Sequence, residues 1–285
     1  MHILVTNDDG VASPGLFALV QELRKIGKVT VLAPDRNWSA SGHVKTLHRP
    51  LRVKETKLMD GSAALASDGA PSDCVALALL GLVPEKIDLV VSGINPNANM
   101  GHDVTYSGTV TAAMEAAIWG VSGIAVSIDA PEYFAGEIDF SPAAHFTHKI
   151  VKALIREKIP FSEFPQIVSP DSIERTSKTA VSSSAGSNNS TKILLNVNVP
   201  YLPVERIRGI RITRLGLRLY NDLLDRREDP RGRPYYWIGG EAPTGIPEEG
   251  TDFGAIAEGA VSVTPLHLDL TAYQAIDKIR TWKFD

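Results

Sequence analysis

The chain has 285 residues, of which 44% are hydrophobic and 22% charged, the balance of a globular protein with a sizeable core, and this excludes fibrous and broadly disordered classes. Its 29 basic and 33 acidic side chains give a formal net charge of −4, which argues against sequence-independent binding of nucleic acid. The single cysteine, Cys74, excludes an intramolecular disulfide, and its apolar surroundings predict a small buried side chain and not a reactive thiol.

The first residues carry no pattern typical of a targeting signal. The stretch MHILVTNDDG has neither a basic start nor a long apolar run, and no segment approaches the roughly 20 apolar residues that span a bilayer. We therefore expect a cytoplasmic protein that binds neither nucleic acid nor a membrane.

The first half of the chain alternates strand-like and helix-like segments. Residues 3–6 predict a buried parallel strand, and Ser13 followed by Pro14 predicts the start of a helix that ends near Gly27. The next predicted elements are a strand at 29–34, a helix at 72–80, a strand at 88–93, a helix at 109–119 and a strand at 124–128. Strands separated by helices favour an α/β fold with a doubly wound, mostly parallel sheet covered on both faces.

Beyond residue 130 the pattern loosens. A helix is expected at 142–156, and the Ser-, Thr- and Asn-rich stretch 169–192 predicts a disordered insertion because it has little apolar surface to offset the entropy of ordering. The remaining predicted elements are strands at 193–200, 207–216 and 260–270, a hairpin containing Tyr235, Tyr236 and Trp237, and a closing helix at 271–282.

Polar clusters follow several of these strands. Asp8 and Asp9 come directly after the first strand, and further clusters lie at 33–42, 92–101 and 106–110. Because parallel sheets bind ligands at the carboxyl ends of their strands, these loops are expected to converge on one rim.

The rim clusters supply oxygen ligands. Two carboxylates, the hydroxyl of Ser39 and the side-chain carbonyl of Asn95 or Asn99 suit Mg²⁺ or Mn²⁺ and not zinc. None of the seven histidines stands in a zinc-site pattern. The alternative for Asp8 and Asp9 is a turn and helix-cap pair near the positive end of a helix.

The stretch YSGTV predicts an anion site at the start of the next helix. Ser107 is placed to cap that helix, and Gly108 lets the backbone approach a ligand, so the amides of residues 108–110 are expected to hold a phosphate. A helix cap without a ligand is the alternative. The chain has no Walker A motif and no G-x-G-x-x-G in its first strand-to-helix turn, which disfavours nucleoside triphosphates and dinucleotides.

Several motifs together extend over almost the whole chain in one order: NDDGV, APDRNWS, DCV, VVSGIN, YSGTV, LNVNVP and GTDFGAIAEGAVSVTPL. They closely resemble the SurE family, stationary-phase survival proteins that act as metal-dependent 5'/3'-nucleotidases. The resemblance implies a Rossmann-like core at 1–130 and, at 131–285, the remaining core strands, an oligomerisation hairpin near 220–250 and a C-terminal helix, all in one SurE-like domain. It also implies a homodimer or homotetramer with swapped C-terminal elements.

The resemblance assigns roles to the rim residues. It implies one Mg²⁺ or Mn²⁺ per subunit, held by Asp8, Asp9, Ser39 and Asn95. It implies phosphate contacts from Asn99, Ser107, Gly108 and Thr109. Two positions depart from the family pattern: Asn97 stands where glycine is usual, and Trp38, where a basic residue is common, is expected either to pack in its loop or to stack on a base.

The expected activity is hydrolysis of nucleoside 5'-monophosphates, with 3'-monophosphates and short polyphosphate as open alternatives. The divalent ion would neutralise the phosphate and lower the pKa of the attacking water. The expected catalytic residues are Asp8, Asp9, Asn99 and Ser107. Two other functions remain open: a haloacid-dehalogenase-like phosphatase that phosphorylates Asp8, although its D-x-D spacing is missing here, and a nonenzymatic nucleotide sensor.

Overall fold

The computed structural model describes residues 1–39, 41–131, 134, 136–157 and 192–284. The insertion predicted at 169–192 lies outside these ranges except for its last residue.

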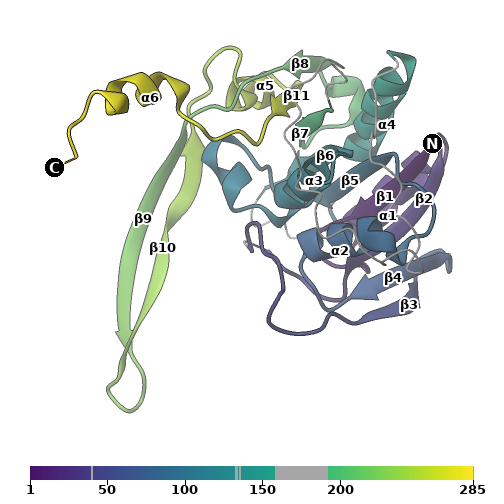
Figure 1. The fold of residues 1–285 in the computed structure, drawn as a ribbon, viewed down its shortest axis with the longest axis horizontal. Coiled ribbons are helices and arrows are strands. Elements are labelled where there is room, and N and C mark those ends of the chain that lie inside the picture. The colour runs from purple at the N-terminus through teal and green to yellow at the C-terminus, as the bar shows by residue number, and fades with distance from the viewer. Residues whose placement is uncertain (40, 132–133, 135, 158–191, 285) are drawn as a thin grey trace.

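A nine-stranded sheet forms the body of the protein, with strand order β3-β4-β2-β1-β5-β6-β7-β11-β8 (Figure 1). Strands β4, β2, β1, β5, β6 and β7 pair in parallel, while β3 and β11 run antiparallel to their neighbours β4 and β7. The strands are β1 (His2–Thr6), β2 (Lys28–Pro34), β3 (Val53–Lys57), β4 (Ala63–Ser67), β5 (Leu89–Asn95), β6 (Ser122–Asp129), β7 (Leu194–Pro200), β8 (Ile210–Ile212), β9 (Arg218–Glu228), β10 (Pro234–Gly245) and β11 (Val261–Leu266).

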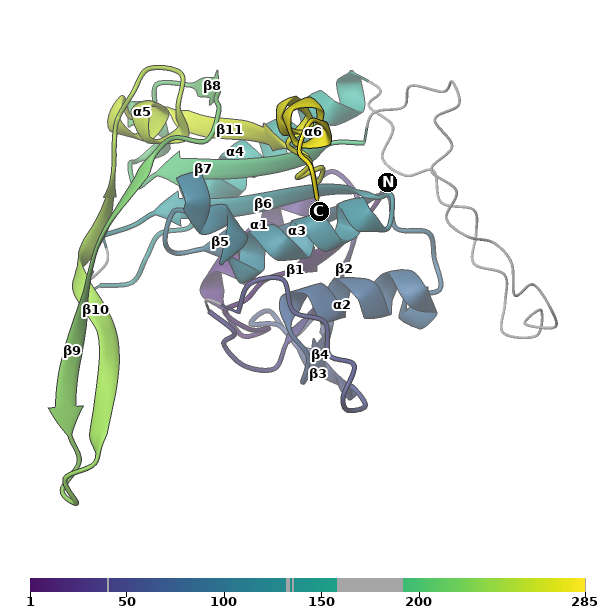
Figure 2. The ribbon, with the colours of Figure 1, turned by 60° about the vertical axis from the view of Figure 1, so that its left-hand side comes forward.

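Helices cover both faces of this sheet. The α-helices are α1 (Pro14–Leu23), α2 (Pro71–Leu77), α3 (Gly108–Ile118), α4 (Ser141–Arg156), α5 (Asp252–Ala257) and α6 (Tyr273–Arg280). A π-helical turn η1 (Ala78–Leu82) extends α2, and 3-10 turns form η2 (Gly101–Thr105) and η4 (Val204–Arg206). Figure 2 shows α2 and α3 in front of the sheet, with α1 and α4 behind it.

The alternation of side chains along the buried strands divides the core into two layers. In β1, Ile3 and Val5 pack with residues of α1 and α4, whereas Leu4 packs with residues of α2 and α3. All three are fully buried, because a strand in the middle of a doubly covered sheet sends successive side chains into opposite layers. Cys74 lies in the second layer, where burial raises the pKa of its thiol far above the usual range.

The predicted fold class is confirmed: the protein is α/β with a mostly parallel sheet between helices. The strand predicted at 207–216 is shorter in the structure than expected, since only residues 210–212 form β8. Strands β3 and β4 were not predicted. The edge strand β3 (VKETK) is mostly exposed and lacks the apolar run of the central strands. No helix in the described ranges is long and apolar enough to cross a membrane.

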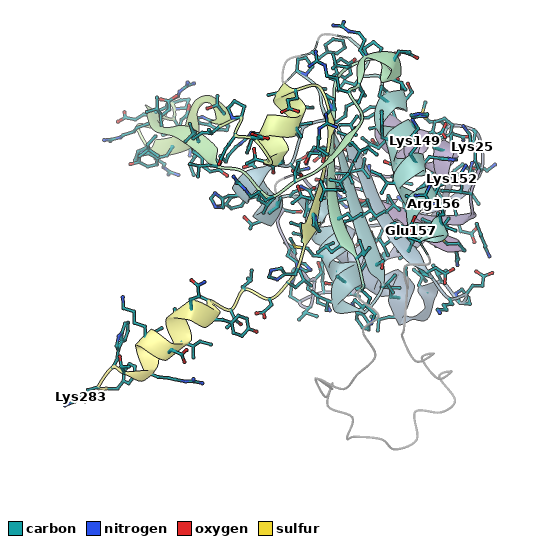
Figure 3. All side chains as sticks on the ribbon, turned by 90° about the horizontal axis from the view of Figure 1, so that it is seen from above. Lys25, Lys149, Lys152, Arg156, Glu157 and Lys283 are labelled. Atoms are coloured by element: carbon teal, nitrogen blue, oxygen red, sulfur yellow. The ribbon has the colours of Figure 1, made fainter. Side chains whose placement is uncertain are left out.

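A two-stranded hairpin projects from the body, as Figures 1 and 2 show. Its strands β9 and β10 pair only with each other in the described part of the chain, and we call residues 218–245 the arm. The C-terminal helix α6 has no buried residue and also lies away from the sheet. Basic side chains gather elsewhere: Figure 3 shows Lys25 beside Lys149, Lys152 and Arg156 of α4, while Lys283 lies at the far end of the C-terminal segment.

Candidate functional site

The two aspartates occupy a turn that hydrogen bonds hold closed at the end of β1. The side chain of Asn7 donates to the carbonyl of Gly10 at 3.1 Å and accepts from its N–H at 3.2 Å. The carbonyl of Asp8 accepts from the N–H of Trp38 at 2.7 Å, which ties the turn to the loop after β2. Asp8 is therefore held in place and is only 4% exposed.

Among the described residues, no cationic side chain lowers the pKa of Asp8 or Asp9. Burial raises the pKa of Asp8, and hydrogen bonds from Thr109 oppose that rise. Burial, and then the charge of Asp8, raise the pKa of Asp9 from 3.8 to about 7. In the described part of the chain, Oδ2 of Asp9 is buried and has no hydrogen-bond partner. A divalent cation would relieve both the repulsion and the unpaired oxygen, so the pair fits the predicted metal site.

The donor set also agrees with a hard, oxygen-binding ion. No group of three or more His, Cys, Asp or Glu side chains that could hold a metal occurs in the ranges described. A metal bound here would therefore need neutral oxygens beside the two carboxylates. The side-chain nitrogen of Asn95 donates to the carbonyl of Asn97, which leaves its oxygen available as a ligand. Asn97 thus stabilises the loop through its backbone at the position where the family pattern has glycine.

The N-terminus of α3 lies directly against Asp8. Ser107 caps the helix, and its Oγ accepts from the N–H of Val110 at 3.1 Å, which leaves the hydroxyl hydrogen free to donate. A Cβ added to Gly108 would lie 2.9 Å from Cβ of Asp8, closer than real side chains approach. Glycine is therefore required here so that the helix start and the carboxylate can meet.

Thr109 is directed to Asp8. Its fully buried hydroxyl donates to Oδ1 of Asp8. The backbone of Thr109 also forms a hydrogen bond with Asp8. Thr109 thus orients the carboxylate, and its contact with phosphate stays a prediction.

Asn99 is fixed by two asparagines from the middle of the sheet. Asn196 and Asn198 of β7 donate their side-chain N–H groups to its carbonyl at 2.7 and 3.0 Å, and Oδ1 of Asn198 accepts from its N–H at 2.8 Å. The side chain of Asn99 donates to Oγ of Ser127 at 2.8 Å. The motif LNVNVP, noted in the sequence without a role, therefore holds the loop that carries Asn95 and Asn99.

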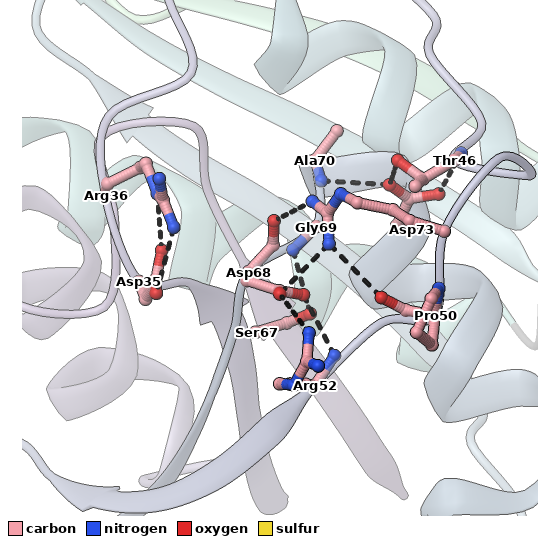
Figure 4. A network of polar contacts seen from close by, with 11 residues as sticks. Asp35, Arg36, Thr46, Pro50, Arg52, Ser67, Asp68, Gly69, Ala70 and Asp73 are labelled. Carbon is pink, nitrogen blue, oxygen red and sulfur yellow. Dashed lines mark hydrogen bonds and ion pairs between the residues drawn. The ribbon is translucent and has the colours of Figure 1, made fainter.

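The loop after β2 is anchored at its far end by Asp73. This buried carboxylate accepts from the N–H and hydroxyl of Thr46, at 2.9 and 2.7 Å, and from the N–H of Ala70 at 3.0 Å, as Figure 4 shows. At the near end, Asn37 Oδ1 accepts from the N–H of Ser39 at 2.7 Å. Trp38 is half-buried and does not line the cavity described next, which favours packing in its loop over stacking on a base.

These loops enclose a cavity of about 660 Å³, within the usual range for small-molecule sites. Of the predicted site residues, its lining includes Asp8, Ser39, Asn95, Asn99 and Ser107. Asp9, Gly108 and Thr109 stand behind this lining, next to Asp8. The cavity thus brings together a carboxylate, hydroxyl and amide oxygens, and the capping Ser107 at a helix N-terminus, a combination that can bind a cation and a phosphate side by side.

Sequence reasoning missed other residues of the cavity and its support. Asp129 and Arg218 line the cavity, and Arg218 is the one positively charged side chain among its described lining residues. Asp252 is fully buried and holds the Asn99 loop from α5. Asp252 lies in the quoted stretch GTDFG, but nothing in that stretch indicates which loop, about 150 residues earlier, it contacts.

Comparisons with known proteins give the relatives of this chain. The family model described as "Survival protein SurE" matches residues 3–222. The chain is 49% identical over 281 residues to a 5'-nucleotidase SurE of Herpetosiphon aurantiacus, with 99% of this chain and 98% of that protein covered. It is 48% identical over 286 residues to a 5'-nucleotidase SurE of Chloroflexus aggregans, with both chains fully covered. The crystal structure of a SurE protein from Aquifex aeolicus superposes with a TM-score of 0.72 at 38% identity and 98% coverage of both chains.

Proposed function

The chain belongs to the SurE family, and we propose from this that it is a divalent-metal-dependent phosphomonoesterase that hydrolyses nucleoside 5'-monophosphates to nucleoside and phosphate. Full-length relatives named 5'-nucleotidases support the substrate class. The observation that carries the proposal is the close contact between Asp8 and the N-terminus of α3. At Gly108 this contact leaves no room for any side chain larger than the hydrogen of glycine. This contact supports the proposal because a carboxylate that could bind a cation lies next to a helix N-terminus that could bind phosphate.

The metal would be held by Asp8, Asp9, Ser39 and Asn95, as one Mg²⁺ or Mn²⁺ per subunit. When bound, such an ion neutralises phosphate charge and lowers the pKa of a water molecule at neutral pH. The unpaired oxygen of Asp9 and the desolvated charge of Asp8 support this assignment.

The remaining rim residues would bind and orient the phosphate. Ser107 would donate its free hydroxyl hydrogen, and the N–H of Gly108, the first residue of α3, would donate beside it at the positive end of the helix. Asn99 contributes its side-chain amide, and its rigid hydrogen-bonded backbone keeps that amide in place as charge develops. Thr109 fixes the direction of the Asp8 carboxylate.

We further propose that the protein forms a homodimer or homotetramer through the arm. A two-stranded hairpin alone is marginally stable in water. The arm nevertheless exposes apolar side chains, among them Leu224 at 69%, Trp237 at 58% and Ile238 at 83%. A second subunit covering these side chains would remove the cost of their exposure.

The test of the activity is phosphate release from nucleoside 5'- and 3'-monophosphates and short polyphosphate. Chelator-treated protein is assayed before and after Mg²⁺ or Mn²⁺ is restored, beside Asp8→Asn. We expect turnover of 5'-monophosphates only with metal, and a loss of roughly 1000-fold or more in the variant because a ligand charge is removed. Wild-type protein that binds nucleotide but releases no phosphate with either metal would contradict the proposal and favour a sensor.

A further inference from the structure

The cavity has a second end, where the arm joins the body. Arg218, the first residue of β9, lines this end together with Asp103, Tyr106 and Asp129. Asp103 belongs to η2, and Asp129 is the last residue of β6. None of these side chains belongs to the metal or phosphate set, so hydrolysis of the phosphate ester leaves them without a role.

Arg218 is fixed in direction by its neighbours. Its Nε lies 2.8 Å from Oδ2 of Asp103, and its guanidinium carbon lies 5.6 Å from the centre of the Phe253 ring. Oδ1 of Asp103 accepts from the hydroxyl of Tyr220 at 2.6 Å. The short Nε contact is poorly aligned, so this buried nitrogen has no hydrogen-bond partner within the described ranges. The ion pair and the ring contact thus fix the direction of the guanidinium, whose residue also lines the cavity.

A buried carboxylate clamps the base of the arm to the Asn99 loop. Asp252 accepts from the N–H of Gly101 and from the N–H of Gly216, both at 2.8 Å. The two segments touch, since a Cβ on Gly101 would lie 2.8 Å from the carbonyl oxygen of Gly216. Arg218 follows Gly216 by two residues, and Asn99 precedes Gly101 by two. The clamp thus joins the start of the arm, which carries Arg218, to the loop that carries Asn99.

The second end is too far from the first for one phosphate to reach both. Asp8 follows β1 and Asp129 ends β6, and these strands are separated by β5. Two strand spacings of about 4.8 Å place them roughly 10 Å apart. A substrate whose phosphate sits at α3 therefore presents its organic part to Arg218 and Asp129.

The charges at the second end suit uncharged polar groups better than another anion. Asp103 and Asp129 more than offset the positive charge of Arg218. Burial raises the pKa of Asp129, and the charge of Arg218 opposes that rise, so these two side chains influence each other across the cavity. A guanidinium that donates and a carboxyl group that accepts match hydroxyl and amino groups, such as those of a sugar and a base.

We propose that Arg218 and Asp129 bind the nucleoside part of the substrate and distinguish nucleotides from simpler phosphate monoesters. This inference rests on the proposed nucleotidase function and specifies how the same site selects its substrate. A substrate can form hydrogen bonds with buried polar groups of a site. An analogue that lacks the matching groups leaves these buried groups unpaired, and the enzyme therefore discriminates strongly against it.

The experiment measures kcat and KM of the metal-loaded enzyme with nucleoside 5'-monophosphates and with p-nitrophenyl phosphate, for wild type, Arg218→Gln and Asp129→Asn. We expect each variant to lose on the order of 10- to 100-fold in kcat/KM on nucleotides, mainly through KM, as when a hydrogen bond to a charged group is removed. On p-nitrophenyl phosphate, which has no sugar or base, we expect less than about a threefold change.

Tyr236→Phe is the control, because Tyr236 lies on the arm, is 54% exposed and does not line the cavity. It should keep the wild-type preference for nucleotides over p-nitrophenyl phosphate. Equal losses on both substrates, or an unchanged preference in Arg218→Gln and Asp129→Asn, would overturn the inference; if Arg218→Gln does not fold, Asp129→Asn decides alone. Wild-type enzyme that cleaves no nucleotide would instead overturn the proposed function.

Discussion

The rim of the sheet contains buried polar side chains that form hydrogen bonds with one another, whereas the arm carries apolar side chains that are exposed. We use "rim" for the carboxyl ends of β1, β2 and β5 with the start of α3. In the rim, Asp8 accepts from Thr109, and Asn99 is held by Asn196 and Asn198. In the arm, Ile238 is 83% exposed. The rim thus forms most of its polar contacts within one chain, while the apolar side chains of the arm stay exposed.

This difference assigns separate tasks to the two regions. A site for a small charged ligand must be preorganised, because rearrangement during the reaction costs free energy. An exposed apolar hairpin is instead stabilised by burial against a partner. Arg218 lies where the two regions meet, since it begins β9 and also lines the cavity. The following predictions test whether each region depends on the features named here.

Among the changes that test this comparison, the largest effect is expected from Gly108→Ala, which disrupts the rim. The added Cβ would lie 2.9 Å from Cβ of Asp8, so either the carboxylate or the helix start must move. A displacement of about 1 Å at a reacting centre can cost about 100-fold in rate, and we expect a fall of that size in kcat/KM on nucleotides. Steady-state kinetics with restored metal measure it.

The control is Gly239→Ala in the arm, where an added Cβ would meet nothing within 4 Å. It should retain wild-type kinetics. Unchanged activity in Gly108→Ala would refute the close-contact requirement that supports the proposed site.

The second prediction concerns the arm. Ile238→Asp places a charge on the exposed apolar surface, so we expect the assembly to dissociate to a lower mass, because burying an unpaired charge in an interface is costly. Light scattering after gel filtration measures this mass. Leu80→Asp is the control, since Leu80 is an exposed apolar residue of the body, 53% accessible, and should leave the mass unchanged. A monomeric wild-type protein would contradict the assembly itself.

The smallest effect is expected on thermal stability. Mg²⁺ or Mn²⁺ at about 100 times its dissociation constant should stabilise the metal-free protein by about 2.7 kcal/mol. In a chain of this size, that corresponds to a rise in Tm of several degrees. Asp9→Asn should abolish most of the rise, because it removes one of the two carboxylates that would bind the ion. A wild-type Tm that does not respond to either ion would argue against the metal site.

The sequence by itself determined the central elements and most of the rim. The apolar runs of β1, β2, β5 and β6 and the Ser-Pro start of α1 are local signals, because a strand buried on both faces must be apolar along its whole length. The turn at Asp8 and Asp9, the cap at Ser107 and the asparagine loop are also contiguous in the sequence. Parallel strand order then places them at one edge.

Only the tertiary structure decided what holds these loops and what faces them. Asn198 contacts a residue 99 positions away, and Asp252 contacts one 151 positions away. Arg218 reaches the cavity only because β9 starts beside η2. Such contacts leave no periodic pattern in the sequence. A single polar residue in a strand or loop has the same local sequence signal whether it faces solvent, a backbone amide or a ligand. Packing of distant segments, and not local preference, determines which of these occurs.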